Sequence, residues 1–186
     1  MDALQEIEEE PEVLPVHQTQ LENGDQIAVR GLVKDLSPWL VPIMAHTDGT
    51  DGTFLHHGIY LKEEMNVIEL HGEDKKSAKP KIRSLTKFVA GSVDAEVYRV
   101  QYKDSDCLPV DETIQLGREA VRKAGSCQPY DLIFNNCETF ATYLKTGKKI
   151  SMQVQKVMIA NVEKLVPVVK KGIASSSASS TGITKR

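Results

Sequence analysis

The residue of this chain best suited to catalyse a reaction is Cys137, in the run Asn135-Asn136-Cys137-Glu138. A cysteine thiolate is a nucleophile, and as a catalyst it needs a base within hydrogen-bond reach to take up its proton. Histidine is the usual base, and the chain has His17, His46, His56, His57 and His71. The sequence is thus compatible with nucleophilic catalysis by a cysteine–histidine pair. The alternative is a buried structural thiol, which is what most free cysteines are.

Cys137 lies at the start of a predicted helix. Asn135 or Asn136 is a suitable N-cap, because its side-chain oxygen can accept an otherwise unpaired amide proton of the first turn. Gly147 suits the left-handed position that ends a helix. Apolar residues follow at helical spacing, at Phe140, Ala141 and Leu144. The helix dipole favours a thiolate at this end, so we expect the pKa of Cys137 to lie below its free value of about 8.5.

The candidate bases lie on a predicted β-hairpin. Residues 54–61 and 67–72 are rich in strand formers and flank a polar connector. Neighbouring residues of a strand point to opposite faces, so only one of His56 and His57 can face Cys137. The register of the hairpin decides which residue of the second strand lies across from these histidines, and the sequence leaves that register open.

The other histidines and cysteines have weaker claims to a role. His17 lies in an acidic tail and His46 in a turn rich in Gly and Asp, so neither is expected to be held rigidly. Cys107 and Cys127 have no candidate partner. A zinc site made of Cys137 and two histidines would lack the paired spacings, Cys-x-x-Cys or His-x₃-His, that support such sites. We therefore expect no metal and no other cofactor.

Length and composition suit one domain with tails. The chain has 186 residues, of which 40 % are hydrophobic and 26 % charged, and its net charge is −3. That charge gives no electrostatic case for nucleic-acid binding. Three cysteines do not suggest a disulfide framework. Neither a secretory signal nor a run of about 18 apolar residues is present, so we expect a cytoplasmic protein without a transmembrane helix.

The chain divides into four regions. Residues 1–20 are acidic and contain prolines, so we expect a loosely ordered tail. Residues 21–150 hold the predicted strands and helices. Residues 151–173 have apolar positions at helical spacing, which indicates an amphipathic helix that either packs on the domain or contacts a membrane surface. The Ser- and Thr-rich residues 174–186 are expected to be disordered.

Within the domain, the predicted strands besides the hairpin are 26–30, 85–90 and 95–102. Residues 73–86 are basic and polar and are predicted to form a loop. The best-marked helix is predicted over residues 112–125, with Asp111 as its cap, acidic residues at its start and basic residues at its end. Residues 31–53 contain two prolines and give no regular prediction.

These motifs, in this order, resemble the lecithin:retinol acyltransferase-like domain family. The motifs that carry the resemblance are Leu21-Glu22-Asn23-Gly24-Asp25, His56-His57-Gly58-Ile59-Tyr60-Leu61 and Asn136-Cys137-Glu138-Thr139-Phe140. The resemblance covers roughly residues 20–150. The family is a circularly permuted relative of papain-like cysteine peptidases, and its histidine precedes its cysteine, as here. The resemblance implies an α+β fold, with a small antiparallel sheet packed against helices and the nucleophile at a helix N-terminus.

Carried over by position, the resemblance implies that Cys137 is the nucleophile and His56 the base, with the Cys137 backbone amide helping to hold the oxyanion. The third polar residue is Glu69 or His71. Alignment favours Glu69, although the family has a histidine in this setting, and either side chain could orient the His56 imidazole. Thr139 stands where the family commonly has another histidine, and it cannot act as a base.

The activity implied is cysteine-dependent acyl transfer through a thioester, by a phospholipid acyltransferase or a phospholipase-type hydrolase. Its partner would be a lipid or small acyl donor, with peripheral membrane contact through residues 151–173. Two alternatives stay open. One is a thiol amidase or peptidase with the same catalytic geometry. The other is an interaction protein that keeps the fold without turnover, which the imperfect third residue and the charged tails motivate.

Overall fold

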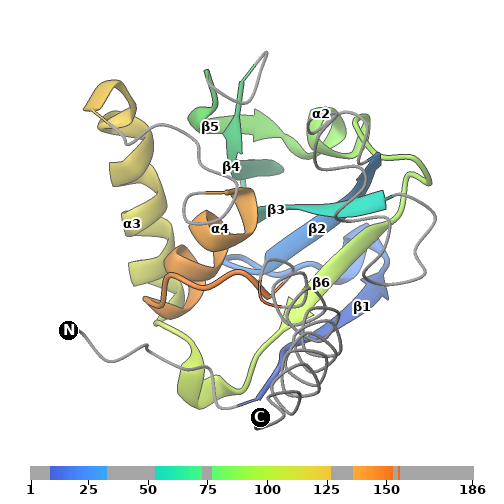
Figure 1. The fold of residues 1–186 in the computed structure, drawn as a ribbon, viewed down its shortest axis with the longest axis horizontal. Helices are drawn as coiled ribbons and strands as arrows, with labels where there is room; N and C mark the ends of the chain where they lie inside the picture. The colour runs from blue at the N-terminus through green and yellow to red at the C-terminus, as the bar shows by residue number, and fades with distance from the viewer. Residues whose placement is uncertain (1–8, 33–52, 73–76, 127–135, 153–154, 156–186) are drawn as a thin grey trace, which may run out of the picture. The chain divides into compact units, whose positions relative to one another are not determined.

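The computed structural model of the chain describes residues 9–32, 53–72, 77–126, 136–152 and 155. They form a six-stranded antiparallel sheet, ordered β1-β6-β2-β3-β4-β5, and three α-helices (Figure 1). The strands are β1 (Glu12–Val16), β2 (Gln26–Leu32), β3 (Thr53–Leu61), β4 (Asn66–His71), β5 (Lys79–Ser84) and β6 (Val97–Gln101). The helices are α2 (Leu85–Val89), α3 (Val110–Arg122) and α4 (Cys137–Thr146), with short 3-10 turns η1 (Gln18–Gln20), η3 (Asp104–Asp106) and η4 (Ala124–Ser126). The predicted α+β class is confirmed.

All of these elements belong to one compact unit, Met1–Met152. A second unit, Gln153–Arg186, lies almost wholly outside the described residues. The amphipathic helix predicted over 151–173 falls largely there, as does the disordered tail predicted over 174–186. In the described part of the chain, no helix is long and apolar enough to cross a membrane.

The predicted hairpin is confirmed as β3 and β4. Its register pairs Tyr60 with Val67 and Gly58 with Glu69. Past Gly58 the two strands separate, because β3 stays paired with β2 as far as Thr53 whereas its pairing with β4 ends. The separation opens a wedge between β3 and β4 at this end of the hairpin.

Both faces of the sheet carry a buried apolar layer. Helices α3 and α4 lie side by side over one face (Figure 1). The buried core on that face consists of Ile59, Leu61, Ile68, Ala141 and Leu144. The opposite face packs against α2, and its buried core consists of Leu21, Ile27, Val29, Tyr60, Val67, Leu85, Phe88 and Val97. Strand alternation therefore places His57 on the α4 face and His56 on the α2 face.

Two edge strands lie where the sequence predicts irregular chain. β1 falls within the predicted tail 1–20 and pairs with β6, and β5 falls within the predicted loop 73–86 and pairs with β4. Each contains a proline, Pro15 or Pro80, which an edge strand tolerates because one side of its backbone needs no partner. The charged, proline-bearing sequence of an exposed edge strand is also that of a loop, so both predictions are wrong over these strands.

The strand predicted over residues 85–90 is also wrong, because this segment forms α2. Ser84 caps the helix, since its side-chain oxygen accepts the amide of Lys87 at 3.3 Å. Leu85 and Phe88 then point together into the core. One helical turn thus buries two apolar side chains that a strand would have placed on opposite faces.

The other element predictions hold. The segment 26–30 lies within β2, and the segment 95–102 contains β6. The predicted helix is α3, and it begins at Val110, with Pro109 rather than Asp111 in the N-cap position.

Candidate active site

Cys137 is the first residue of α4, as the sequence predicts. The Asn136 side-chain oxygen accepts the Thr139 amide at 2.8 Å, so Asn136 is the N-cap. Gly147 closes the helix in the left-handed region, at φ 75°, where a residue without a Cβ is favoured. The thiol is only 5 % exposed. Helix α4 is thus capped at both ends, and Cys137 lies at its N-terminus, which is the positive end of the helix dipole.

The thiol lies in the wedge between β3 and β4. Its Sγ is 4.0 Å from the Leu55 carbonyl oxygen on β3. On the other side it packs against Leu70 of β4, with Ala78 and Phe140 in the same cluster. A residue of the α4 layer can therefore approach the histidine on the opposite face, since the strands part at this point.

His56 bridges the thiol and a buried carboxylate. Its Nε2 lies 2.6 Å from Glu69 Oε2, and the ring is near enough to Cys137 for the thiol to act on its pKa. The ring stacks at a tilt on Phe88, with centroids 5.4 Å apart. Burial tends to lower the pKa of His56, but the charges of Cys137 and Glu69 and their hydrogen bonds to the ring raise it to about 9. The imidazole is thus held between a thiol and a carboxylate.

Glu69 is fully buried and has two strong partners. Besides its contact with His56, Glu69 accepts a hydrogen bond at Oε1 from Arg83 Nη1, over 2.9 Å. Burial tends to raise the pKa of Glu69, yet the hydrogen bond from His56 and the charges of His56, Arg83 and His71 hold it below the ordinary value. The carboxylate therefore stays ionised although it is out of contact with solvent.

His71 stands one step further from the thiol. Its Nδ1 lies 2.9 Å from Arg83 Nη1 and 4.0 Å from Glu69 Oε2. The structure thus brings Cys137, His56 and Glu69 together, and it joins His71 to them through the Arg83 guanidinium.

The sequence reading misses Arg83, because residues 73–86 are assigned to a loop. The strand register reveals it: Glu69 pairs with Lys81, so Arg83 is its diagonal neighbour on the same face. Once β5 is known to be a strand, the alternation of Lys79, Lys81 and Arg83 is the signal that would have found it.

His57 points to the opposite face of β3 from His56, as expected for its neighbour on a strand. Its Nδ1 lies 3.2 Å from Gln26 Nε2, and the Tyr102 hydroxyl donates to Gln26 Oε1 at 3.0 Å. Burial, followed by the charge of His56, lowers the pKa of His57 to about 3. His57 is therefore a neutral group in a buried polar network beneath α4.

Glu138 is a second residue that the sequence reading leaves without a role. It is buried beside Cys137 and accepts the Ser151 hydroxyl and, at 3.0 Å, the Met152 amide. The carboxylate thus ties the chain that follows α4 to the start of that helix, next to the thiol.

In the described ranges, no three residues among His, Cys, Asp and Glu are grouped so that they could hold a metal ion. The polar groups around Cys137 instead pair with one another.

Comparison with known proteins identifies the family. The profile described as lecithin retinol acyltransferase matches residues 19–150. The chain belongs to this family. Lecithin retinol acyltransferase of Mus musculus is 31 % identical over 123 residues, which are 55 % of this chain and 53 % of that protein. The match thus spans about half the length of this relative. No solved structure matches the chain. Membership in the family supports an acyltransferase or hydrolase type of function.

Proposed function

We propose that this protein is a cysteine-dependent acyltransferase or hydrolase that works through an acyl-thioester on Cys137. The observation that carries the proposal is the His56 imidazole, held between the Cys137 thiol and the buried Glu69 carboxylate. A nucleophile, a base and an orienting group in contact are what this chemistry requires. An interaction protein without turnover would not need this chain of contacts, so that alternative is disfavoured.

In the first half-reaction His56 takes the proton of Cys137, and the thiolate attacks the acyl carbonyl carbon. The carbon–sulfur bond forms, and the oxyanion is stabilised by the Cys137 backbone amide at the start of α4. The tetrahedral intermediate then collapses, the bond to the leaving oxygen breaks, and the imidazolium gives its proton to that oxygen. An acyl-thioester and a free alcohol result.

In the second half-reaction neutral His56 takes a proton from water or from an acceptor hydroxyl or amine. The activated oxygen or nitrogen attacks the thioester, and Cys137 leaves as a thiolate. Water as the acceptor makes the reaction a hydrolysis, and another acceptor makes it an acyl transfer. The protein ends with its original proton count.

Glu69 orients the imidazole and stabilises its charge through the bond to Nε2. We assign the third catalytic position to Glu69 rather than His71. Glu69 Oε2 lies 2.6 Å from His56 Nε2, whereas the His71 ring contacts Arg83 and lies 4.0 Å from Glu69. Arg83 holds the other oxygen of Glu69. A carboxylate anchored at one oxygen keeps the second oxygen aimed at the ring.

A phospholipid is the acyl donor we propose. The name of the mouse relative joins lecithin, a phospholipid, to acyl transfer. We accordingly propose that the protein acts at a cytoplasmic membrane surface, with residues 151–173 as one point of peripheral contact.

A panel of acyl donors tests the proposal: phospholipids, amides and peptides, each incubated with the wild type and with Cys137→Ala. We expect acyl release or transfer from phospholipid with the wild type and none with the variant, while Cys107→Ala, a matched loss of a second thiol, retains activity. Full acyl transfer by Cys137→Ala would contradict the proposal. Turnover of amides alone would keep Cys137 as the nucleophile and reassign the substrate.

A further inference from the structure

The basic residues of the described chain are distributed unevenly. Most of them are in ion pairs: Arg30–Asp94, Lys62–Glu22, Arg83–Glu69, Arg99–Asp25, Lys103–Glu9, Arg118–Glu64, Lys123–Glu119 and Lys148–Asp106. Six basic residues of the described ranges take part in none of these ion pairs. Of these, Arg122, Lys145 and Lys149 belong to α3, α4 and the chain just after α4. The remaining three, Lys79, Lys81 and Lys87, belong to β5 and α2. All three are exposed. Their charges are therefore uncompensated in a chain whose net charge is −3.

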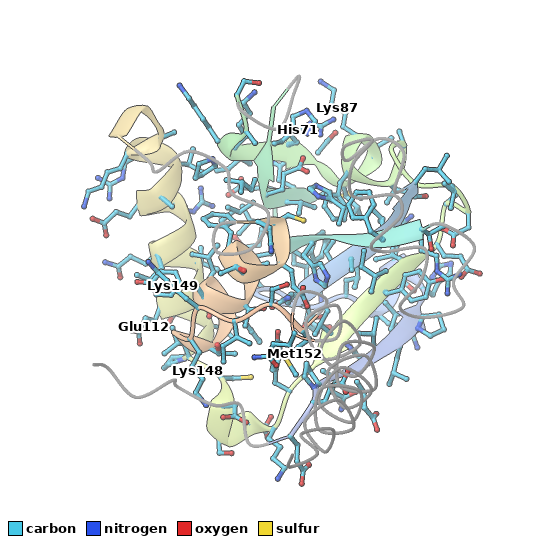
Figure 2. The ribbon with its side chains drawn as sticks, viewed as in Figure 1. His71, Lys87, Glu112, Lys148, Lys149 and Met152 are labelled. Atoms are coloured by element: carbon cyan, nitrogen blue, oxygen red, sulfur yellow. The ribbon has the colours of Figure 1, made fainter. Side chains whose placement is uncertain are left out.

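These lysines share one edge of the sheet. Lys79 and Lys81 alternate with buried Pro80 along β5, so they lie on the same face as Arg83. Lys87 follows in α2, where its carbonyl oxygen accepts Arg83 Nη2 at 3.3 Å. Figure 2 shows the Lys87 and His71 side chains at this edge, and Arg83 contacts both residues.

We call this set, namely Lys79, Lys81, Arg83, Lys87 and His71, the β5 basic edge. The carboxylate that contacts it is Glu69, which is fully buried and bonded to His56 and Arg83. Residues 73–76, between β4 and β5, are Glu-Asp-Lys-Lys and add no net charge. The edge thus presents positive charge to solvent.

The β5 basic edge adjoins the candidate active site. Lys81 is the register partner of Glu69, and Lys79 is that of His71. Arg83 joins Glu69 to His71 at 2.9 Å on each side. A surface bound to these lysines would therefore lie next to His56.

We propose that the β5 basic edge docks the protein on an anionic phospholipid bilayer, so that the site at Cys137 faces the lipid. The proposal rests on the proposed acyl transfer from lipid. Clustered basic side chains are attracted to bilayers that contain anionic lipid, because the surface potential of such bilayers is negative. The overall negative charge of the chain disfavours a long polyanion such as nucleic acid.

The test compares vesicle binding by the full-length protein and by Lys79→Gln/Lys81→Gln/Lys87→Gln. The vesicles are phosphatidylcholine with or without phosphatidylserine. We expect the triple variant to bind phosphatidylserine vesicles on the order of 100-fold more weakly. This factor corresponds to the loss of ~1 kcal/mol of binding free energy for each of the three lysines. Binding of the wild type should weaken as salt is raised and should be far weaker on phosphatidylcholine alone.

The matched control is Lys62→Gln/Lys103→Gln/Lys123→Gln, which removes the same charge from paired lysines elsewhere. We expect it to bind like the wild type. Equal loss in both triple variants, no loss in the first, or tighter binding to single-stranded DNA than to vesicles would each overturn the proposal.

Cys137→Ala separates docking from catalysis, because it removes the nucleophile and leaves the β5 basic edge intact. We expect it to bind phosphatidylserine vesicles like the wild type. Vesicle binding without any acyl transfer by the wild type would contradict the proposed function and would still support the docking surface.

Discussion

At the scale of the residue, the proposed base His56 has two neighbours that act on its charge. Its Nε2 lies 2.6 Å from Glu69 Oε2, and the Cys137 thiol acts on the same ring. Both partners favour the protonated ring, which raises the pKa of His56 to about 9. An imidazolium that persists at neutral pH beside the sulfur favours the thiolate, and it is ready to protonate the leaving group.

Glu69→Gln should move the alkaline limb of the pH–rate profile. In the wild type, kcat/KM should fall as pH rises through about 9, because the imidazolium is lost. Loss of the carboxylate removes a charge that stabilises the imidazolium, so the pKa of His56 falls. The alkaline limb then moves to lower pH by about 1–3 units. Kinetics of thioester formation across the pH range measure the limb. An unchanged limb would show that Glu69 does not act on His56.

Arg83→Gln should lower the free energy of unfolding by about 3 kcal/mol at neutral pH, because it leaves the buried Glu69 charge without its ion-pair partner. Folding depresses the pKa of Glu69 below 4.5. This stability is therefore present above the unfolded pKa and is lost as pH falls through the folded pKa. The difference between variant and wild type should shrink at acid pH.

Urea unfolding at several pH values measures this difference. Arg30→Gln is the control, since its exposed pair with Asp94 at 3.6 Å should contribute less than about 1 kcal/mol. Equal losses in the two variants would contradict the buried role of Arg83.

At the scale of the element, the site depends on close packing between β3 and α2. A Cβ on Gly58 would lie 2.4 Å from Val67 Cγ1 and 3.3 Å from Phe88 Cε2. Phe88 in turn stacks on His56. The glycine of the His-His-Gly-Ile-Tyr motif therefore lets the base and the ring behind it sit close to the sheet.

Gly58→Ala should destabilise the fold by about 1–3 kcal/mol through overpacking. Gly125→Ala is the matched control, because a Cβ there meets nothing within 4 Å, and it should stay within about 0.5 kcal/mol. Thermal or urea unfolding of both variants makes the comparison. A neutral Gly58→Ala would mean that the hairpin relaxes freely.

Local pattern was enough to predict the elements that carry the proposed nucleophile and the proposed base. The Asn136 cap and the Gly147 terminator are short-range features, and they define α4. The hairpin bearing His56 follows from strand formers around a polar turn. These elements were predictable because capping and alternation involve residues a few positions apart.

The arrangement between elements was not predictable in the same way. The choice between Glu69 and His71 depends on the register of the hairpin. The two side chains share a face of β4, so a shift of two residues would put one in the place of the other. Arg83 was missed because β5 is an edge strand whose sequence is that of a loop. Both facts arise from pairing between strands, which no local pattern encodes.

At the scale of the whole molecule, Glu138 links the start of α4 to the segment that follows this helix. Glu138→Gln should weaken the bonds to Ser151 and Met152, because a neutral amide has one acceptor oxygen in place of two. We expect about 1–2 kcal/mol less stability and faster hydrogen exchange at the Met152 amide. Glu119→Gln, which removes the exposed partner of Lys123, should leave that exchange unchanged. Unaltered exchange in Glu138→Gln would contradict the link.

The charge layout places three exposed lysines without ion pairs next to the candidate site, whereas most of the other described basic residues are paired with carboxylates. A thiol on the lipid-facing side of a docked protein could meet a substrate that stays in its bilayer. Docking and chemistry are separable, because the lysines and Cys137 are different residues of one unit.

The most direct test of the proposed chemistry is the mass of the enzyme after an acid quench during turnover of a phospholipid. Peptide mapping should find one acyl group on the peptide that contains Cys137, removable by hydroxylamine as a thioester is. The peptide with Cys107 should carry none, and Cys137→Ala should carry none anywhere. Turnover of the phospholipid with Cys137 unmodified, or an acyl group on another residue, would contradict Cys137 as the nucleophile.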